Sequence, residues 1–127
     1  MKFFADTANL EAIKEVNDLG ILDGVTTNPS LMAKEGIKGE ENIKKHYKAI
    51  CNLVDGDISA EVISTDIEGI LREARELASL ADNIVVKIRH DNYSWAMEDS
   101  NVITRKETMG ETPSEAVAKL WLELNKK

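Results

Sequence analysis

Asn83-Ile84-Val85-Val86-Lys87-Ile88 is the run of residues from which the architecture of the chain can be inferred. Four of its six residues are β-branched and apolar, which is typical of a strand covered on both faces. An ammonium group on an interior strand is costly unless it is paired or gives up its proton. A neutral amine attacks carbonyl carbon, so Lys87 is a candidate for Schiff-base chemistry. The alternative is a lysine near a strand end whose ammonium group reaches water.

The length, net charge and cysteine content of the chain limit the class of protein to which it can belong. The chain has 127 residues, a formal net charge of -7 and one cysteine, Cys51. The length suits a single domain, and the negative charge argues against nucleic acid or an anionic membrane as the main partner. A lone cysteine excludes an intrachain disulfide and fits a reducing compartment. Without a membrane-length apolar run or a signal peptide, we expect a soluble, cytoplasmic protein.

Three more segments have the composition of strands, and helical patterns separate them. The predicted strands are residues 2–6, 24–28, 58–63 and 83–88, and the predicted helices are residues 10–20, 41–54 and 65–81, with a short helical turn at 30–34. Thr7 or Asn9 can cap the first helix, and Thr65 with Glu68 reads as a capping box for the last. This alternation predicts βαβ units and a parallel sheet, either doubly wound or part of a (β/α) barrel.

Each predicted strand carries a polar residue near its carboxyl end. Strand alternation places Asp6, Thr26, Asn28, Glu61 and Lys87 on one side of the sheet. In parallel α/β proteins that end is where sites are built. Taken singly, each has a structural alternative: helix capping for the aspartate, turn formation for the threonine and asparagine, and a buried ion pair for the glutamate and lysine. Their convergence favours a site.

Four segments of the chain resemble the transaldolase family, and the resemblance is nearest to its short bacterial branch with the fructose-6-phosphate aldolase-like enzymes. They are Phe3-Phe4-Ala5-Asp6-Thr7-Ala8-Asn9, Asp23-Gly24-Val25-Thr26-Thr27-Asn28-Pro29-Ser30, Ser59-Ala60-Glu61-Val62 and Asn83-Ile84-Val85-Val86-Lys87-Ile88. The resemblance covers residues 1–88. It implies a (β/α)8 TIM barrel that transfers a dihydroxyacetone unit between sugar phosphates through a lysine Schiff base, as part of carbohydrate and pentose phosphate metabolism.

The resemblance also implies a role for each polar residue. Lys87 would be the Schiff-base nucleophile, and Asp6 would take and return the hydroxyl proton during carbon–carbon cleavage. Glu61 would activate the water that enters and leaves during Schiff-base formation. Thr26 and Asn28 would bind the substrate hydroxyls. No metal and no cofactor is implied, and a glutamate at position 61 favours transaldolase over simple aldolase.

The resemblance ends at Arg89, where the family has proline. We therefore expect a half-barrel over residues 1–88, an irregular linker over 89–111 and a C-terminal helix over 112–127, opened by a capping box in Thr112-Pro113-Ser114-Glu115. Only four strands of the barrel are present, and the segments that bind phosphate in the family are missing.

Two functions follow. The first is a transaldolase-like transferase, impaired by the missing half-barrel. The second is a non-catalytic half-barrel that self-associates, with Trp95, Trp121 and Leu124 as candidate contacts. A flavodoxin-like binding domain ranks lower, because Asp6-Thr7-Ala8-Asn9 lacks the glycines that cradle phosphate.

Overall fold

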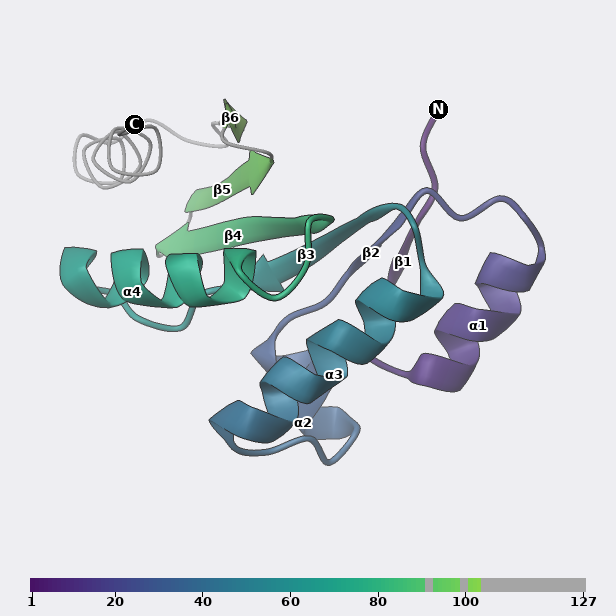
Figure 1. Cartoon of the computed structure of the whole chain (residues 1–127), viewed down its shortest axis with the longest axis horizontal. Coiled ribbons are helices and arrows are strands. Elements are labelled where there is room, and N and C mark those ends of the chain that lie inside the picture. Colours follow the sequence, from purple (N-terminus) through teal and green to yellow (C-terminus); the bar gives the residue numbers. More distant parts are fainter. Residues whose placement is uncertain (91–92, 99–100, 104–127) are drawn as a thin grey trace.

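The six strands in the described part of the chain form one sheet, and they are ordered as they occur in the sequence. The computed structural model describes residues 1–90, 93–98 and 101–103, with the side chains of residues 1–88. The elements are β1 (Phe4–Asp6), α1 (Leu10–Asp18), β2 (Gly24–Thr26), α2 (Pro29–Lys34), α3 (Glu40–Leu53), β3 (Asp57–Glu61), α4 (Ile67–Ala78), β4 (Ile84–His90), β5 (Tyr93–Glu98) and β6 (Asn101–Ile103). β1 to β4 are parallel, whereas β5 and β6 are antiparallel to their neighbours (Figure 1).

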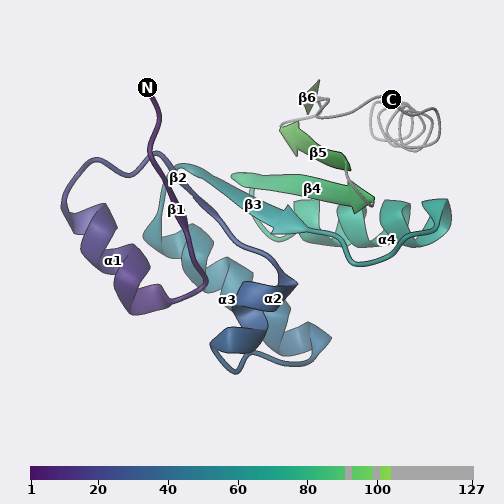
Figure 2. The same cartoon turned by 180° about the vertical axis from the view of Figure 1, so that it is seen from behind.

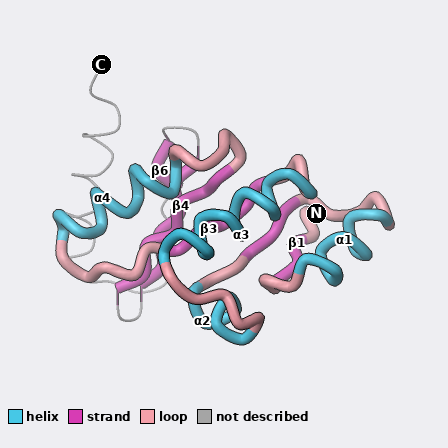
Figure 3. Tube along the Cα trace, turned by 60° about the horizontal axis from the view of Figure 1, so that its bottom comes forward, coloured by secondary structure: helices cyan, strands magenta, loops and turns pink. Residues whose placement is uncertain are grey.

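The strand order decides between the two predicted architectures. Each of the first three connections joins a strand to its immediate parallel neighbour. Right-handed crossovers made always in the same direction place every helix on the same face. Figures 2 and 3 show α1, α3 and α4 together on one face of the sheet. A doubly wound sheet has helices on both faces, so the arrangement is that of half a TIM barrel, which confirms the predicted fold class.

Strand alternation divides the buried residues from the half-buried ones. Ile58 and Ala60 of β3 and Val86 and Ile88 of β4 are buried. They belong to the core with helix residues that include Ile13, Tyr47, Ile50, Ile70 and Ala74. Burying one such isoleucine contributes about 2 kcal/mol. The residues between them point to the opposite face, which we call the inner face.

Asn83 holds the register of the two central strands. Its side-chain amide donates to the carbonyl oxygens of Val54 and Gly56, each at 2.9 Å, just before β3 begins. The pairing that follows sets Ile58 beside Ile84 and Glu61 beside Lys87. A slip by one residue would turn the apolar set to the inner face, so this register also determines which polar groups meet.

The helix caps agree with the prediction at α1 and differ at α4. Asn9 caps α1, accepting a hydrogen bond from the Ala12 amide at 2.8 Å. At α4 the cap is Asp66, which accepts from the Gly69 amide at 2.9 Å. The predicted capping box starting at Thr65 was therefore wrong by one residue. Aspartate ranks above threonine as an N-cap, so the capping-box spacing of Thr65 and Glu68 pointed to the wrong residue.

The segment expected to be an irregular linker contains two strands in its described part. β4 continues to His90, and β5 pairs with it, with Trp95 beside Ile88. Tyr93, Trp95 and Met97 recur with a period of two, which is the strand signal that the sequence analysis missed. The predicted helix over residues 112–127, with Trp121 and Leu124, lies outside the described residues, and the domain boundaries stay a prediction.

Glu73 closes the turn that follows β3. Its carboxylate accepts hydrogen bonds from the Ile63 amide at 2.6 Å, from the Ser64 amide at 3.2 Å and from Ser64 Oγ. Burial raises the pKa of the Glu73 carboxyl, but these hydrogen bonds outweigh it and the pKa is lowered. The ionised side chain thus ties α4 to the end of β3.

We expect Glu73→Gln to lower the free energy of unfolding by roughly 1 kcal/mol at neutral pH, discounted for partial exposure. A lowered pKa means that the stabilisation is complete above the unfolded-state value and is lost as pH falls through the folded-state value. The two proteins should therefore converge in urea unfolding as the pH falls through the lowered folded-state pKa of Glu73. Glu15→Gln, an exposed position on α1, is the control, and a pH-independent difference would contradict the argument.

Candidate active site

Lys87 and Glu61 form an ion pair on the inner face. They are register partners on neighbouring parallel strands, and Lys87 Nζ lies 3.4 Å from Glu61 Oε2. The lysine side chain is 33% exposed and the glutamate side chain 12%. The amine is therefore held by a carboxylate and still open to a molecule that approaches the inner face.

Asp6 and Thr26 form a second pair at the other side of the inner face. They too are register partners, and Thr26 Oγ1 donates a hydrogen bond to Asp6 Oδ1 at 3.0 Å. Thr26 is in turn the register partner of Ser59, and Ser59 of Val85. Asp6 thus lies at the level of Ser59, and the Glu61–Lys87 pair lies two residues further towards the strand ends.

The four strands bring these pairs to one face without joining them. Neighbouring strands lie about 4.8 Å apart, so β1 and β4 are three such spacings apart along the sheet. No hydrogen bond or ion pair links Asp6 to Glu61 or Lys87 among the described residues. A substrate that used both pairs would have to span the inner face between them.

Asn28 caps a helix through its side-chain oxygen, and its side-chain nitrogen remains available as a hydrogen-bond donor. The strand ends at Thr26, and Asn28 is the N-cap of α2, where its Oδ1 accepts from the Leu31 amide at 2.9 Å. The structural alternative weighed for this residue was turn formation, and its structural role here is the cap of α2. Its side-chain amide nitrogen donates to no other residue in the described part of the chain, so the capping role leaves two N–H groups for a ligand.

Ser59 is a polar residue of the inner face that was not among the predicted site residues. It stands between Thr26 and Val85 in the register and is half-buried. The signal for it was its position two residues before Glu61, on the same face of the same strand. Thr27 points the other way, and its buried hydroxyl oxygen has no hydrogen-bond partner within the described residues.

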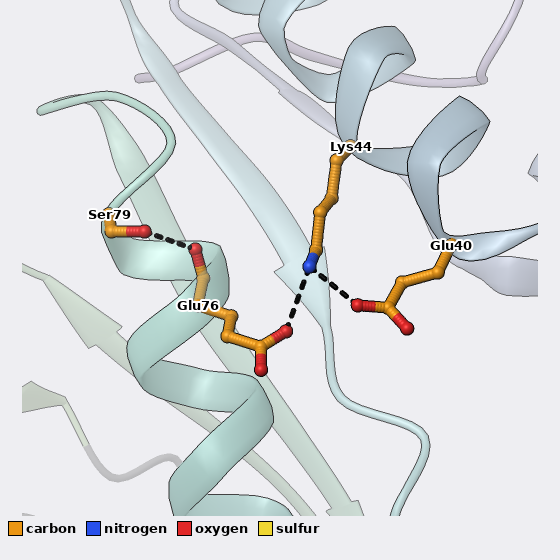
Figure 4. Close-up of polar contacts among 4 residues, drawn as sticks. All are labelled: Glu40, Lys44, Glu76 and Ser79. Atoms are coloured by element: carbon orange, nitrogen blue, oxygen red, sulfur yellow. Dashed lines mark hydrogen bonds and ion pairs between the residues drawn. The ribbon is translucent and has the colours of Figure 1, made fainter.

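A cavity of about 290 Å³ lies between α3 and α4, beside the carboxyl end of β3. Among the five predicted site residues it includes Glu61 alone. Lys44 spans it, 2.6 Å from Glu40 Oε1 and 2.9 Å from Glu76 Oε2 (Figure 4). The hydrogen bonds to Glu40 and Glu76 raise the pKa of Lys44 above its usual range. Lys44 is therefore held as an ammonium ion and is no candidate for the nucleophile.

Neither a metal site nor a membrane segment is found where the structure describes the chain. No three His, Cys, Asp or Glu side chains in that part are placed to hold a metal ion. None of its helices is both long and apolar enough to cross a membrane.

Four parallel strands in sequential order, with a lysine–carboxylate pair at their carboxyl ends, define a chain of the TIM-barrel class. Its residues 3–90 match the model of the transaldolase/fructose-6-phosphate aldolase family, and the chain belongs to that family. This confirms the resemblance to the transaldolase family on which the sequence analysis relied.

The relatives match 88 residues of the chain. A probable transaldolase of Bacteroides fragilis is 69% identical over 88 residues, and one of Porphyromonas gingivalis is 68% identical over the same number. A probable transaldolase of Cytophaga hutchinsonii is 67% identical over 88 residues. Each match covers 69% of this chain and 40% of the relative. The chain thus spans well under half the length of the curated relatives that it matches.

A double-mutant cycle on Lys87→Met and Glu61→Gln measures what the ion pair contributes to stability. Because a third of the lysine side chain is exposed, we expect a coupling of about 0.5 kcal/mol in urea unfolding. A coupling of roughly 3 kcal/mol, the size of a buried pair, would mean that the two residues are there to hold the fold.

Proposed function

We propose that the chain carries the Schiff-base chemistry of a transaldolase, with Lys87 as the nucleophile. The observation that supports this most directly is the Lys87–Glu61 pair, with 3.4 Å between Nζ and Oε2 and the lysine open to the inner face. A purely structural pair needs no access for a ligand. A lysine that must reach a ketose carbonyl does.

Glu61 serves the water steps of Schiff-base formation. The unprotonated amine of Lys87 attacks the ketose carbonyl carbon, a C–N bond forms, and the oxygen becomes the hydroxyl of a carbinolamine. Loss of that hydroxyl as water leaves the iminium, and a carboxylic acid nearby supplies the proton for it. Glu61, already within 3.4 Å of the amine, is the group placed to exchange these protons directly or through one water.

In this proposal Asp6 carries out the proton transfers that accompany cleavage of the carbon–carbon bond. Its carboxylate takes the proton of the substrate hydroxyl at the carbon that leaves, the C–C bond breaks, and the electron pair moves into the iminium to give an enamine on Lys87. The aldehyde departs, and a second aldehyde can be attacked by the enamine with the proton returned from Asp6. Thr26 holds Asp6 in place at 3.0 Å, and the Asn28 amide is a donor for the substrate hydroxyls.

We propose sugar phosphates as the substrates, with transfer slowed in this chain. The match to the family covers residues 3–90. With a net charge of -7, the field of the chain repels such an anion. We expect binding of fructose 6-phosphate to be weak, and we place the protein in the cytoplasm on the evidence of its single free cysteine, Cys51.

Borohydride trapping tests the nucleophile. Incubation with fructose 6-phosphate or dihydroxyacetone, followed by reduction, should add to the intact chain the mass of one ketose, less one water and plus two hydrogens, and peptide mapping should place it on Lys87. Lys87→Met should abolish the adduct. Lys44→Met is the matched control and should leave it unchanged, because Lys44 is paired with two carboxylates away from the inner face. No adduct at saturating ketose would contradict the proposal.

Variants of the two carboxylates, Glu61 and Asp6, should have different effects in the same assay. We expect Glu61→Gln to slow adduct formation by roughly 100-fold, the usual effect of losing an acid–base group. Asp6→Asn should leave trapping of dihydroxyacetone unchanged and lower the release of aldehyde from fructose 6-phosphate by a similar factor. Equal effects of both variants on trapping would contradict the division of roles.

A second candidate function is self-association of a half-barrel without catalysis. The observation that favours it is the outer edge of β1, which pairs with β2 on one side and with no described strand on the other. Unpaired edges recruit further strands. The self-association itself does not depend on the chemistry of Lys87, so its test is separate from the trapping experiment.

A further inference from the structure

The backbone of β1 presents its free hydrogen-bonding groups at alternate residues. Phe3 accepts from the Asp23 amide at 2.8 Å, and the Thr7 amide donates to Thr26 at 3.1 Å. In a parallel pair the residues that bond to one neighbour alternate with those that face the other side. The amide and carbonyl groups of Phe4 and Asp6 therefore point away from β2, and by the same alternation so do those of Lys2.

The same edge exposes large apolar side chains. Phe3 is 50% exposed and Phe4 42%. The Phe4 ring lies against Gly24, since a Cβ built there would come within 2.3 Å of its Cε1 atom. Unpaired backbone amide and carbonyl groups on an edge strand, together with exposed apolar side chains, are typical of an interaction surface.

We propose that a second copy of this chain pairs with this surface, its β1 running antiparallel to the first about a two-fold axis at Phe4. In this register Phe4 lies opposite the partner's Phe4, and Lys2 opposite the partner's Asp6. All of these residues have their free backbone groups on the shared edge, so each opposed pair exchanges both of its hydrogen bonds. This deepens the self-association proposed above by naming its surface and register.

Charge complementarity selects this register. Lys2, Phe4 and Asp6 lie on one face of the strand because side chains alternate. The antiparallel pair thus contains a central phenylalanine pair flanked on each side by a lysine–aspartate pair. Aromatic and opposite-charge pairs across strands are favourable. A shift by two residues would place Phe4 opposite the partner's Asp6 and lose both kinds of contact.

Symmetry makes the contact closed. A two-fold axis uses the same surface on both copies, so no further copy can add to β1. Pairing β1 with a different edge of the next copy would leave one edge free in each step and produce a filament. On the inner face the arrangement also brings Lys2 of the partner subunit next to Asp6.

Complementary charge reversals test the register. In Lys2→Glu two carboxylates face each other, and in Asp6→Lys two ammonium groups do. We expect each variant alone to raise the dissociation constant for dimers about tenfold or more. Mixed together, the two variants should form a heterodimer, because each opposed pair then again joins a cation and an anion. Sedimentation velocity and native mass spectrometry measure both results.

Hydrogen exchange of the unaltered protein provides a second measurement, should a variant fail to fold. The Phe4 and Asp6 amides should become protected as the protein concentration rises, while the Ala5 amide, which faces β2, should be protected at all concentrations. This test uses no substrate, so it is separate from the trapping of Lys87.

Three outcomes would overturn the proposal. A monomer at every soluble concentration contradicts it. So does a dimer that neither charge reversal weakens, which would leave self-association intact on another surface. Protection of the Phe4 amide at all dilutions would mean that another part of the same chain covers β1. Restoration of the dimer by mixing the two variants supports it.

Discussion

The right-handed crossover between neighbouring parallel strands is the constraint on which the rest of the structure depends. Since β1 to β4 follow one another across the sheet, each crossover turns the same way and deposits its helix on the same face. One face is therefore filled with the core that includes Ile13, Ile50 and Ile70. The other face is left to the polar side chains. The polar side chains can form a site on the inner face because the helices cover the opposite face.

Much of this arrangement could be predicted from local patterns. The β-branched run around Lys87, the helical stripes and the turn residues each point to the element that forms, and they agree with one another. The failures are local as well. The cap of α4 was predicted at Thr65 and lies at Asp66, because the prediction followed the capping-box spacing of Thr65 and Glu68 and not the stronger N-cap preference of aspartate. β5 was missed because its period-two pattern stands among polar residues that resemble a loop.

The site was predictable to the extent that it follows from strand alternation. Alternation placed Glu61 and Lys87 on one face, and the parallel register then made them neighbours. It did not show that Asn28 would leave the strand and cap α2, since an asparagine before proline suits both places. The cavity between α3 and α4 could not be predicted at all. It depends on how two helices distant in sequence pack, with Lys44 between Glu40 and Glu76, and no single pattern encodes that packing.

The outer edges of β1 and β4, the first and last strands of the parallel part of the sheet, are covered differently. This difference limits where a further strand can pair. In a closed TIM barrel the far edge of the fourth strand is taken by a fifth parallel strand. Here that edge is taken by β5, antiparallel to β4, with Lys87 beside Ala96. A fifth parallel strand could bind there only by displacing β5 and its ladder of hydrogen bonds. The edge of β1 has no such cover among the described residues. Of the two outer strands of the parallel part, β1 is therefore the one whose edge is open to a further strand, next to Asp6 and on the side of the inner face opposite to Lys87.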